Sequence, residues 1–287
     1  MRNKRDKFHI LLIQAFAFPA NSKLMGRPMD GPKEARIMNY ENFRHLLDDV
    51  DWDVHPGPLA TYGDWPVETR EEFCLVAAGR LPIVREACES GLYDAIVLLG
   101  GGEPGFQESV EIARPFGIPV TACAYAQMHM AAMLGNKFSV IDLAENHNMY
   151  YYNLVRQHHF EQRCASIRNI NFPLPRPPHT DVPTFREERE KALRGERSVM
   201  LETAVEEAVA AIEEDGAEVI TFGCSATFWM QPLLEQRLHE LGWEVPVLEG
   251  YSCAITLAKS MLSLAVTASG LRFPGPIARK WRRRKLF

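Results

Sequence analysis

The chain has 287 residues, 46% of them hydrophobic and 24% charged, with a formal net charge of −5 at pH 7. This length is enough for one large domain or two of ordinary size, each with its own buried core. The acidic balance argues against nucleic acid as a partner, because nucleic-acid binding generally needs a net basic surface. No apolar stretch approaches the roughly 18 residues that cross a bilayer, so no membrane partner is expected either.

Six cysteines are scattered through the chain without the short spacings that are typical of zinc sites and disulfide frameworks. We therefore expect no metal site, and we expect most thiols to be plain buried residues of a cytoplasmic protein. The start of the chain is interpreted as a charged leader and a first buried strand rather than a signal peptide. The basic run 278–287 is interpreted as a solvated tail or a subunit contact.

Apolar runs alternate with helical patterns along the first half of the chain. Strands are expected at 8–16, 93–100, 118–125 and 137–144, with a further short one at 52–57. Apolar residues at helical spacing predict helices at 31–49, 68–91, 106–117 and 126–135.

The second half continues the alternation. Helices are expected at 147–160, 184–214, 228–241 and 252–268, and strands at 164–170, 217–223 and 244–250. The proline-rich stretch 171–183 is interpreted as a long loop. Strands that are apolar on both faces and alternate with helices predict an α/β fold with parallel sheets covered on both sides.

The two halves also resemble each other. The stretch "DAIVLLGGGEPG" leads through a helix to "GIPVTACAYAQMHMAAMLG", and "AEVITFGCSATF" leads through a helix to "EVPVLEGYSCAITLAKSML". The repeat predicts two pseudo-symmetric α/β domains whose matched turns converge on an active site in the cleft between them. We assign 1–122 to the first domain, completed by 251–287, and 123–250 to the second.

Cys224 stands in one of these matched turns, between an expected strand and an expected helix. The helix dipole and backbone N–H donors are expected to lower the pKa of a thiol at this position and so make a thiolate accessible near neutral pH. The small neighbours Ser225, Ala226 and Thr227 would let a substrate approach the backbone. Position alone does not separate this interpretation from that of a buried structural cysteine.

Four stretches carry a resemblance to a known family, namely "VITFGCSAT", "VPVLEGYSCAITLAKSML", "GIPVTACAYAQMHMAAMLGNKFSVI" and "RCASIRNI". Over about residues 90–268 the sequence resembles the aspartate/glutamate/hydantoin racemase superfamily, and its hydantoin racemase branch most closely. The resemblance implies two flavodoxin-like domains, a small-molecule substrate, no cofactor and a homo-oligomer.

In the racemases of this superfamily two cysteines flank the substrate's Cα: one thiolate removes the proton and the opposing thiol supplies one to the other face. By resemblance, Cys224 falls on the second of these cysteines. Gly100 stands at the position of the first, and Glu103 stands at an acidic position that follows it. The two-thiol mechanism is therefore not available in this chain, because it needs an acid–base group on each face.

Three interpretations of the missing thiol remain open. Another residue replaces it; the candidates, which stand at or near the ends of neighbouring elements, are Glu103, Cys123, Tyr125 and His129. Alternatively the reaction is one-sided, as in arylmalonate decarboxylase, a relative with glycine at the first position and a lone cysteine proton donor at the second. In the third interpretation the protein has lost catalysis and binds a small ligand.

Substrate contacts are expected from the two turns and from neighbouring strand ends. The N–H groups of the turns 100–103 and 224–227 would stabilise an enolate-like oxyanion. Substrate contacts are also expected at the end of the strand at 137–144, from Asp142, Glu145, Asn146, His147 and Asn148. Capping of the next helix by Asp142 or Asn146 is an equally weighted alternative. The expected substrate-binding residues are Gln14, Gly100, Gly101, Gly102, Tyr125, Asn146, Ser225, Ala226, Thr227 and Glu249.

Two histidines are not the preferred candidates for a catalytic role. His129 is more often a core residue than a base, and His158 is expected to be solvated. The preferred hypothesis is a cofactor-independent, cysteine-dependent racemase or isomerase that acts at the carbon alpha to a carbonyl of a small acid or cyclic amide. Cys224, Glu103 and Cys123 are the expected catalytic residues. A decarboxylase or other lyase, and a non-catalytic binder, are the alternatives.

Overall fold

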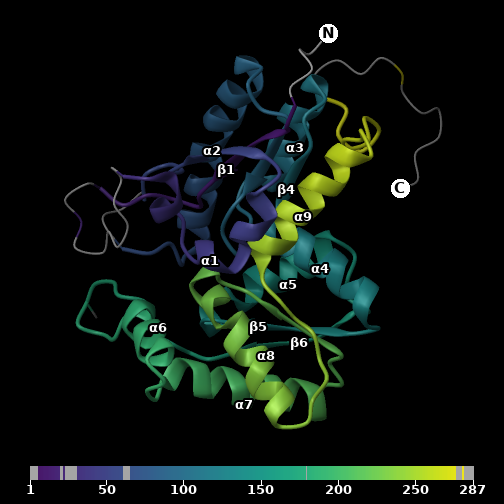
Figure 1. Ribbon diagram of the computed structural model, residues 1–287. Helices are drawn as coiled ribbons and strands as arrows, with labels where there is room; N and C mark the ends of the chain where they lie inside the picture. Colours follow the sequence, from purple (N-terminus) through teal and green to yellow (C-terminus); the bar gives the residue numbers. More distant parts are fainter. Residues whose placement is uncertain are drawn as a thin grey trace.

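The strands of the computed structural model form two four-stranded parallel sheets (Figure 1). The structure describes residues 6–19, 22, 31–60, 65–178, 180–275 and 280. The first sheet contains β1 (His9–Ile13), β2 (Asp51–His55), β3 (Ala95–Leu98) and β4 (Val120–Ala122). The second contains β5 (Phe138–Asp142), β6 (Cys164–Asn169), β7 (Val219–Phe222) and β8 (Val247–Leu248).

The two sheets have the same strand order. It is β2-β1-β3-β4 in the first and β6-β5-β7-β8 in the second, and every strand pair is parallel. Each half of the chain therefore places its first and third strands at the centre of its sheet. This confirms the predicted α/β fold with two pseudo-symmetric parallel sheets, and it brings the ends of β1, β3, β5 and β7 to corresponding places.

Helices cover both sheets. Those that follow strands of the first sheet or pack near it are α1 (Tyr40–Phe43), α2 (Arg70–Ser90), α3 (Phe106–Ala113) and α9 (Gly250–Ser263). Those of the second half are α4 (Cys123–Leu134), α5 (Asn148–Gln157), α6 (Phe185–Leu193), α7 (Val199–Glu213) and α8 (Gln231–Glu240). Short 3₁₀ helices are η1 (Lys33–Arg36), η2 (Arg44–Leu47), η3 (Arg114–Phe116), η4 (Glu145–His147) and η5 (Ser225–Met230).

The chain crosses between the sheets twice. After β4 it enters α4, which packs on β7 of the second sheet, and after β8 it enters α9, which returns to β3 and β4 (Figure 1). The expected completion of the first domain from the C-terminal side stays a prediction. The domain boundaries themselves stay a prediction, and most of the basic run 278–287 lies outside the described residues.

Two helices that the sequence pattern predicts as continuous are interrupted. The expected helix 31–49 is divided into η1, α1 and η2, because Asn39 adopts a left-handed conformation with φ 61°. The expected helix 184–214 is divided into α6 and α7 around Gly195, which has φ 72°, and Ser198 caps the second part by accepting from Leu201 N. Helical spacing of apolar residues continues across both breaks, so the pattern alone does not reveal them.

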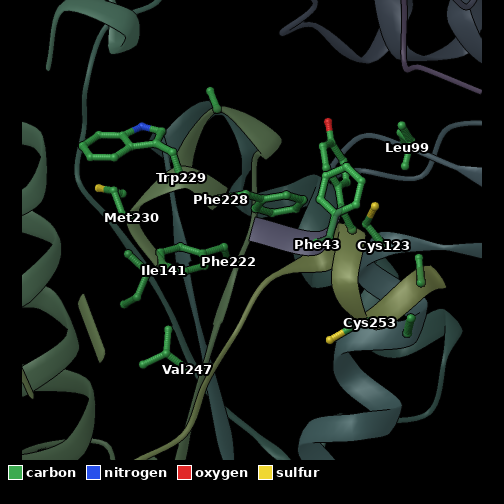
Figure 2. Packing of buried hydrophobic residues seen from close by; sticks show 14 of the residues in the cluster. Phe43, Leu99, Cys123, Ile141, Phe222, Phe228, Trp229, Met230, Val247 and Cys253 are labelled. Carbon is green, nitrogen blue, oxygen red and sulfur yellow. The ribbon is translucent and has the colours of Figure 1, made fainter. Parts of the chain in front are cut away.

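The hydrophobic core is continuous between the halves. Figure 2 shows Phe228 between Phe43 and Cys123 on one side and Trp229 and Met230 on the other, all members of one buried cluster. The ring of Tyr251 contacts two of them edge-on, with centroid distances of 5.7 Å to Phe43 and 5.1 Å to Phe228. Burial of these large rings fixes the two sheets relative to each other.

A buried arginine supports the first sheet where its central strands end. Arg80 of α2 is completely buried and donates to the carbonyls of Pro104 at 3.2 Å, Ile13 at 3.4 Å and Leu99. Among the described residues no carboxylate pairs with it. Burial lowers the pKa of Arg80 to about 10, which still leaves the guanidinium charged at neutral pH. This side chain therefore joins the ends of β1 and β3 to the turn that follows β3.

We expect Arg80→Met to lower the free energy of unfolding by about 3 kcal/mol, since it leaves buried carbonyls without a donor. Arg85→Met on the exposed face of the same helix is the control, and it should change stability by less than about 0.5 kcal/mol. Urea denaturation of both variants measures the difference. Equal stability of the two variants would contradict the supporting role of Arg80.

Candidate active site

Loops from the ends of both sheets enclose a small cavity of about 50 Å³. The loop after β1 contributes Ala15 and Phe16, the turn after β3 contributes Gly100, Gly101 and Gly102, and the turn after β7 contributes Cys224 and Ser225. His147, Tyr150 and Tyr151 line it from η4 and α5, and Phe73 lines it from α2. The cleft expected between the two domains is therefore present at the matched turns.

The two turns touch each other through their backbones. A Cβ atom added to Gly101 would lie 1.8 Å from the Gly223 oxygen and 2.8 Å from the Cys224 Cα, so no side chain can stand at this position. At Gly102 the added atom would lie 2.8 Å from the Tyr150 ring. Glycine at both positions is thus required by the approach of one domain to the other.

The hydroxyl of Tyr151 lies at this contact. It donates toward the Gly101 oxygen at 2.6 Å and is also close to the Gly223 oxygen. A phenol has one hydrogen to donate, so it serves the two carbonyls in turn or shares its proton between them. Burial, and then the Asp142 carboxylate, raise the pKa of Tyr151 well above its usual value, which keeps the donor protonated.

Gly100 has a backbone that does not suit a cysteine. Its φ is +112°, and an added Cβ would lie 2.7 Å from the Ala15 Cβ. Side chains other than that of glycine are strained in this region of φ. The absence of the first thiol is therefore matched by local geometry, and the neighbouring loop occupies the space that a side chain at this position would need.

Cys224 lies where the small cavity meets a larger one. It is half-buried, and its N–H donates to Asp142 Oδ1 at 2.8 Å. Burial, and then the Asp142 carboxylate, raise the pKa of the Cys224 thiol to about 12, although the Ala226 N–H favours the thiolate. The expectation of a lowered pKa was wrong, because burial of the thiol, together with the Asp142 carboxylate behind the turn, outweighs the effect of the N–H donor.

Asp142, at the end of β5, is the anchor of this turn. It is completely buried, and its Oδ1 accepts from Cys224 N, from Leu143 N at 2.7 Å and from His147 Nδ1 at 3.4 Å. Neither it nor Asn146 caps the following helix, whose N-terminal residue makes no side-chain cap. Asn146 is exposed and lies outside the lining of both cavities, so the structure places it away from the expected site.

Glu103 has a structural position. It is buried with φ 45°; Oε2 accepts from Tyr125 N at 2.8 Å, and Oε1 pairs closely with His158 Nε2. The carboxylate thus ties the glycine turn to the first turn of α4 and to the end of α5. His158 is only 7% exposed, which corrects the expectation that it is solvated. Glu103 lies outside the lining of both cavities, so the structure does not place it where a replacement for the missing thiol is expected.

The other expected replacements also lie away from the two cavities. Cys123 is completely buried with its Sγ 3.6 Å from the Leu98 oxygen, and burial, followed by the charge of Glu249, raises its pKa well above the usual value. Tyr125 packs on His129, with ring centroids 4.1 Å apart. Burial lowers the pKa of His129, whose Nδ1 lies 2.8 Å from the backbone carbonyl oxygen of Tyr125. These side chains pack the interface behind the first turn.

Two further expected residues have helix-capping and turn roles. Glu249 caps α9 by accepting from Tyr251 N at 2.8 Å and Ser252 N at 2.6 Å, and it lies outside the lining of both cavities. Thr227 is buried, and its hydroxyl donates to the Cys224 oxygen at 2.6 Å. Both were expected to contact or orient substrate. In the structure Glu249 caps a helix, and Thr227 stabilises the turn through its hydrogen bond to the Cys224 oxygen.

The larger cavity has a volume of about 1010 Å³ and shares Ala15, Phe16, Val67, Cys224 and Ser225 with the small one. Gln14 lines it, as expected, and its Nε2 donates to the Arg36 oxygen at 2.9 Å. Ala226 lines it as well. The rings of Phe16 and Phe18 are 5.5 Å apart in an edge-on arrangement and make this side of the cavity apolar.

The described residues contain neither a metal-binding cluster nor a membrane-spanning helix. In the described ranges no group of three or more His, Cys, Asp and Glu side chains could hold a metal ion. The helices of the same ranges include none that is long and apolar enough to cross a membrane.

The fold and the site define a class of protein with two pseudo-symmetric α/β domains and a cavity between their matched turns. The family model described as Asp/Glu/Hydantoin racemase matches residues 74–258, more than half of the chain. The chain belongs to this family, which confirms the resemblance seen in the sequence.

Individual relatives agree with this assignment. The hydantoin racemase of Paenarthrobacter aurescens is 31% identical over 176 residues, which cover 61% of this chain and 64% of that relative. The match thus spans just under two thirds of the relative's length. The solved structure of allantoin racemase from Klebsiella pneumoniae has a TM-score of 0.69 at 23% identity, covering 96% of both chains. A double mutant of arylmalonate decarboxylase has a TM-score of 0.53 at 16% identity, covering 90% of this chain and 93% of that one. These two structures show that the fold is shared.

We expect Tyr151→Phe to lower the free energy of unfolding by about 2 kcal/mol, because two facing carbonyls lose their donor. Tyr152→Phe is a matched control, since this neighbouring side chain is 47% exposed. The control should change stability by less than about 0.5 kcal/mol. Urea denaturation distinguishes the two; a Tyr151→Phe variant as stable as the control would argue against a structural contact between the turns.

We expect Gly100→Cys to destabilise the protein by about 3 kcal/mol without increasing activity, from a strained backbone and a close contact with Ala15. Gly117→Cys isolates the backbone part, because Gly117 has φ +71° with nothing within 4 Å of an added Cβ. That control should cost only about 1–2 kcal/mol. Thermal unfolding measures both, and a stable, more active Gly100→Cys protein would contradict the geometry described for this turn.

Proposed function

We propose that this protein is a cofactor-independent racemase that inverts the carbon alpha to a carbonyl in a small cyclic amide or acid, with a hydantoin-type ring as the preferred class. The observation that carries the proposal is the position of Cys224, which lines a small cavity between two touching, glycine-containing turns from the two sheets. Family membership supports the same class of reaction.

The chemistry depends on stabilising an anion. A proton beside a carbonyl leaves slowly in water mainly because the resulting enolate is unstable, so donors aimed at the developing oxyanion accelerate the step most. Among the described residues, no hydrogen bond uses the N–H groups of Gly101 and Gly102. These groups are therefore available to bind the carbonyl oxygen of a substrate in the small cavity.

Cys224 serves as a proton donor in this site. Burial and the Asp142 carboxylate hold its pKa at about 12, so the resting side chain is a thiol. A thiol beside the reacting carbon delivers its proton to the enolate without any prior deprotonation, and the thiolate then has the basicity to act in the reverse direction. The raised pKa thus supports a donor role rather than the nucleophilic one.

The two cavities suggest how a substrate would lie. A planar ring with adjacent carbonyl and N–H groups would occupy the small cavity, while its substituent would extend past Phe16 into the larger one. Relatives named hydantoin racemase and allantoin racemase act, by their names, on compounds with such rings. We extend this substrate class to the present chain as part of the proposal.

A decarboxylase is the second candidate, favoured by one observation. Gly100 leaves the first turn without a thiol, so among the described residues Cys224 is the one cysteine that lines the small cavity. A single donor is sufficient when carbon dioxide leaves and a proton enters from one face. The fold shared with an arylmalonate decarboxylase supports this candidate. Binding of a small ligand without turnover is the third.

We further propose that the protein acts as a homo-oligomer in the cytoplasm, on a small molecule and without nucleic-acid or membrane partners. The acidic net charge of −5 supports the last part of this statement. Light scattering during size-exclusion chromatography measures the subunit count directly.

We expect wild-type protein in heavy water to introduce deuterium at Cα of enantiopure 5-substituted hydantoins while the carbon skeleton stays intact. Cys224→Ala should reduce the rate of racemisation by at least about 100-fold. Cys164→Ala is the control, because this cysteine is also half-buried but lies at the start of β6, outside the lining of both cavities. Proton NMR and optical rotation follow exchange and inversion separately.

Substituted malonates complete the panel. Loss of a carboxylate with deuterium in the product would establish the decarboxylase instead. Equal activity of Cys224→Ala and wild type on every compound would overturn both enzyme assignments.

A further inference from the structure

A histidine that the sequence analysis named only as one of several residues near expected substrate contacts lies in the small cavity. His147 ends η4, directly before α5, and lines the same cavity as Cys224. None of the four residues expected to replace the missing thiol lines this cavity. We propose that His147 is the second acid–base group of the site and takes the place of the thiol that Gly100 lacks; this inference rests on the proposed racemase function.

Asp142 orients the imidazole. Its Oδ1 lies 3.4 Å from His147 Nδ1, and a carboxylate oxygen can only accept, so Nδ1 carries the hydrogen. In the neutral ring the lone pair is then on Nε2. This is the arrangement in which a carboxylate fixes the tautomer and orientation of a catalytic histidine.

The Nε2 atom of His147 lacks a hydrogen-bond partner within the described part of the chain. It is buried, and no group among the described residues forms a hydrogen bond with it, the Cys224 thiol included. The whole residue is only 4% exposed. An unpaired polar nitrogen costs free energy when it is buried, so its presence at a cavity indicates that a ligand supplies the missing partner.

Cys224 and His147 are both connected to Asp142 Oδ1, one through its backbone N–H and the other through its ring. They therefore hold fixed positions relative to each other, and both face the small cavity without bonding to each other. A substrate carbon that enters between them would have a thiol and an imidazole as its two neighbours.

The proton transfers balance without a further reactant. Nε2 takes the Cα proton, and the electron pair of the C–H bond moves into the carbonyl to give the enolate. The Cys224 S–H then gives its proton to the other face of the same carbon, which leaves a thiolate, an imidazolium and the inverted product. In the reverse direction the thiolate is the base and the imidazolium is the acid.

The surroundings of His147 suit both of its protonation states. Burial lowers the pKa of His147, but the hydrogen bond and the charge of Asp142 outweigh it, so that the pKa ends above its ordinary value. Phe73 covers the ring edge-on, with centroids 6.1 Å apart. The titratable groups that face it are Asp142 from β5, Glu68 from the segment before α2, Cys224, and Tyr150 and Tyr151 from α5.

The test is His147→Asn, which keeps a side-chain N–H donor on the same side as Nδ1 but has no base at Nε2. Racemisation should fall by at least about 100-fold. In heavy water at alkaline pH, where Cys224 begins to form a thiolate, the variant should still exchange Cα of one enantiomer above the rate of buffer alone without inverting it, and Cys224→Ala should exchange the opposite enantiomer. His159→Asn is the control, because His159 is exposed with φ 62°, a conformation that asparagine tolerates.

A merely structural role would give a different result. His147→Asn would then lose exchange and inversion of both enantiomers to the same degree, or racemise at the rate of the control, and either outcome overturns the proposal. Circular dichroism and urea denaturation confirm that the compared variants are folded.

A second measurement needs no substrate. The rate of Cys224 alkylation by iodoacetamide, followed on its peptide by mass spectrometry, should rise with pH in two steps in wild type, since the imidazolium of His147 favours the thiolate until it titrates. In His147→Asn we expect a single rise toward alkaline pH. Identical profiles would overturn the role of His147. If the wild-type profile has two steps but no compound of the panel is turned over, the proposed racemase function fails while the pairing of the two groups stands.

Discussion

The contact between the two glycine-containing turns is the constraint on which the site depends. Gly101 touches Gly223 backbone to backbone, and the Tyr151 hydroxyl lies beside both carbonyls. Each turn is held from behind by a buried charged side chain: Arg80 donates to carbonyls around the first, and Asp142 accepts from the backbone of the second. The pseudo-symmetric sheets therefore bring the two turns into contact. The side chains behind the turns carry opposite charges.

The opposite charges behind the two turns give the turns different roles in the reaction. An Arg80 nitrogen would lie only 3.7 Å from a Cβ at Gly100, so positive charge lies behind the turn whose N–H groups are available to a carbonyl oxygen. Burial, and then the negative charge of Asp142 behind Cys224, keep its thiol protonated. An enolate oxygen is thus favoured on the first turn and a proton donor on the second. A site with two equivalent thiols would need similar surroundings on both sides, and this chain does not have them.

Much of this arrangement could be predicted from the sequence. The repeated strand–turn–helix pattern predicts both sheets, and the motif around Cys224 locates the thiol and the glycine opposite it. The directions of side chains next to strand ends could not be predicted in the same way. Glu103 follows the first turn but has a left-handed backbone that turns it into the interface, to His158. Along η4, one residue rotates a side chain by about 120°, which separates exposed Asn146 from buried His147. The segment at the end of the strand at 137–144 predicts substrate contacts, but the sequence does not show which of its side chains reaches the cavity.

The most direct test of this account is a crystal structure of the protein with a 5-substituted hydantoin bound. We predict that the ring lies in the small cavity, with a carbonyl oxygen within hydrogen-bonding distance of the Gly101 or Gly102 N–H and Cα between the Cys224 thiol and the His147 ring. A hydantoin bound only in the larger cavity, with its Cα remote from Cys224, would contradict the claim that the meeting of the two turns creates the reaction site.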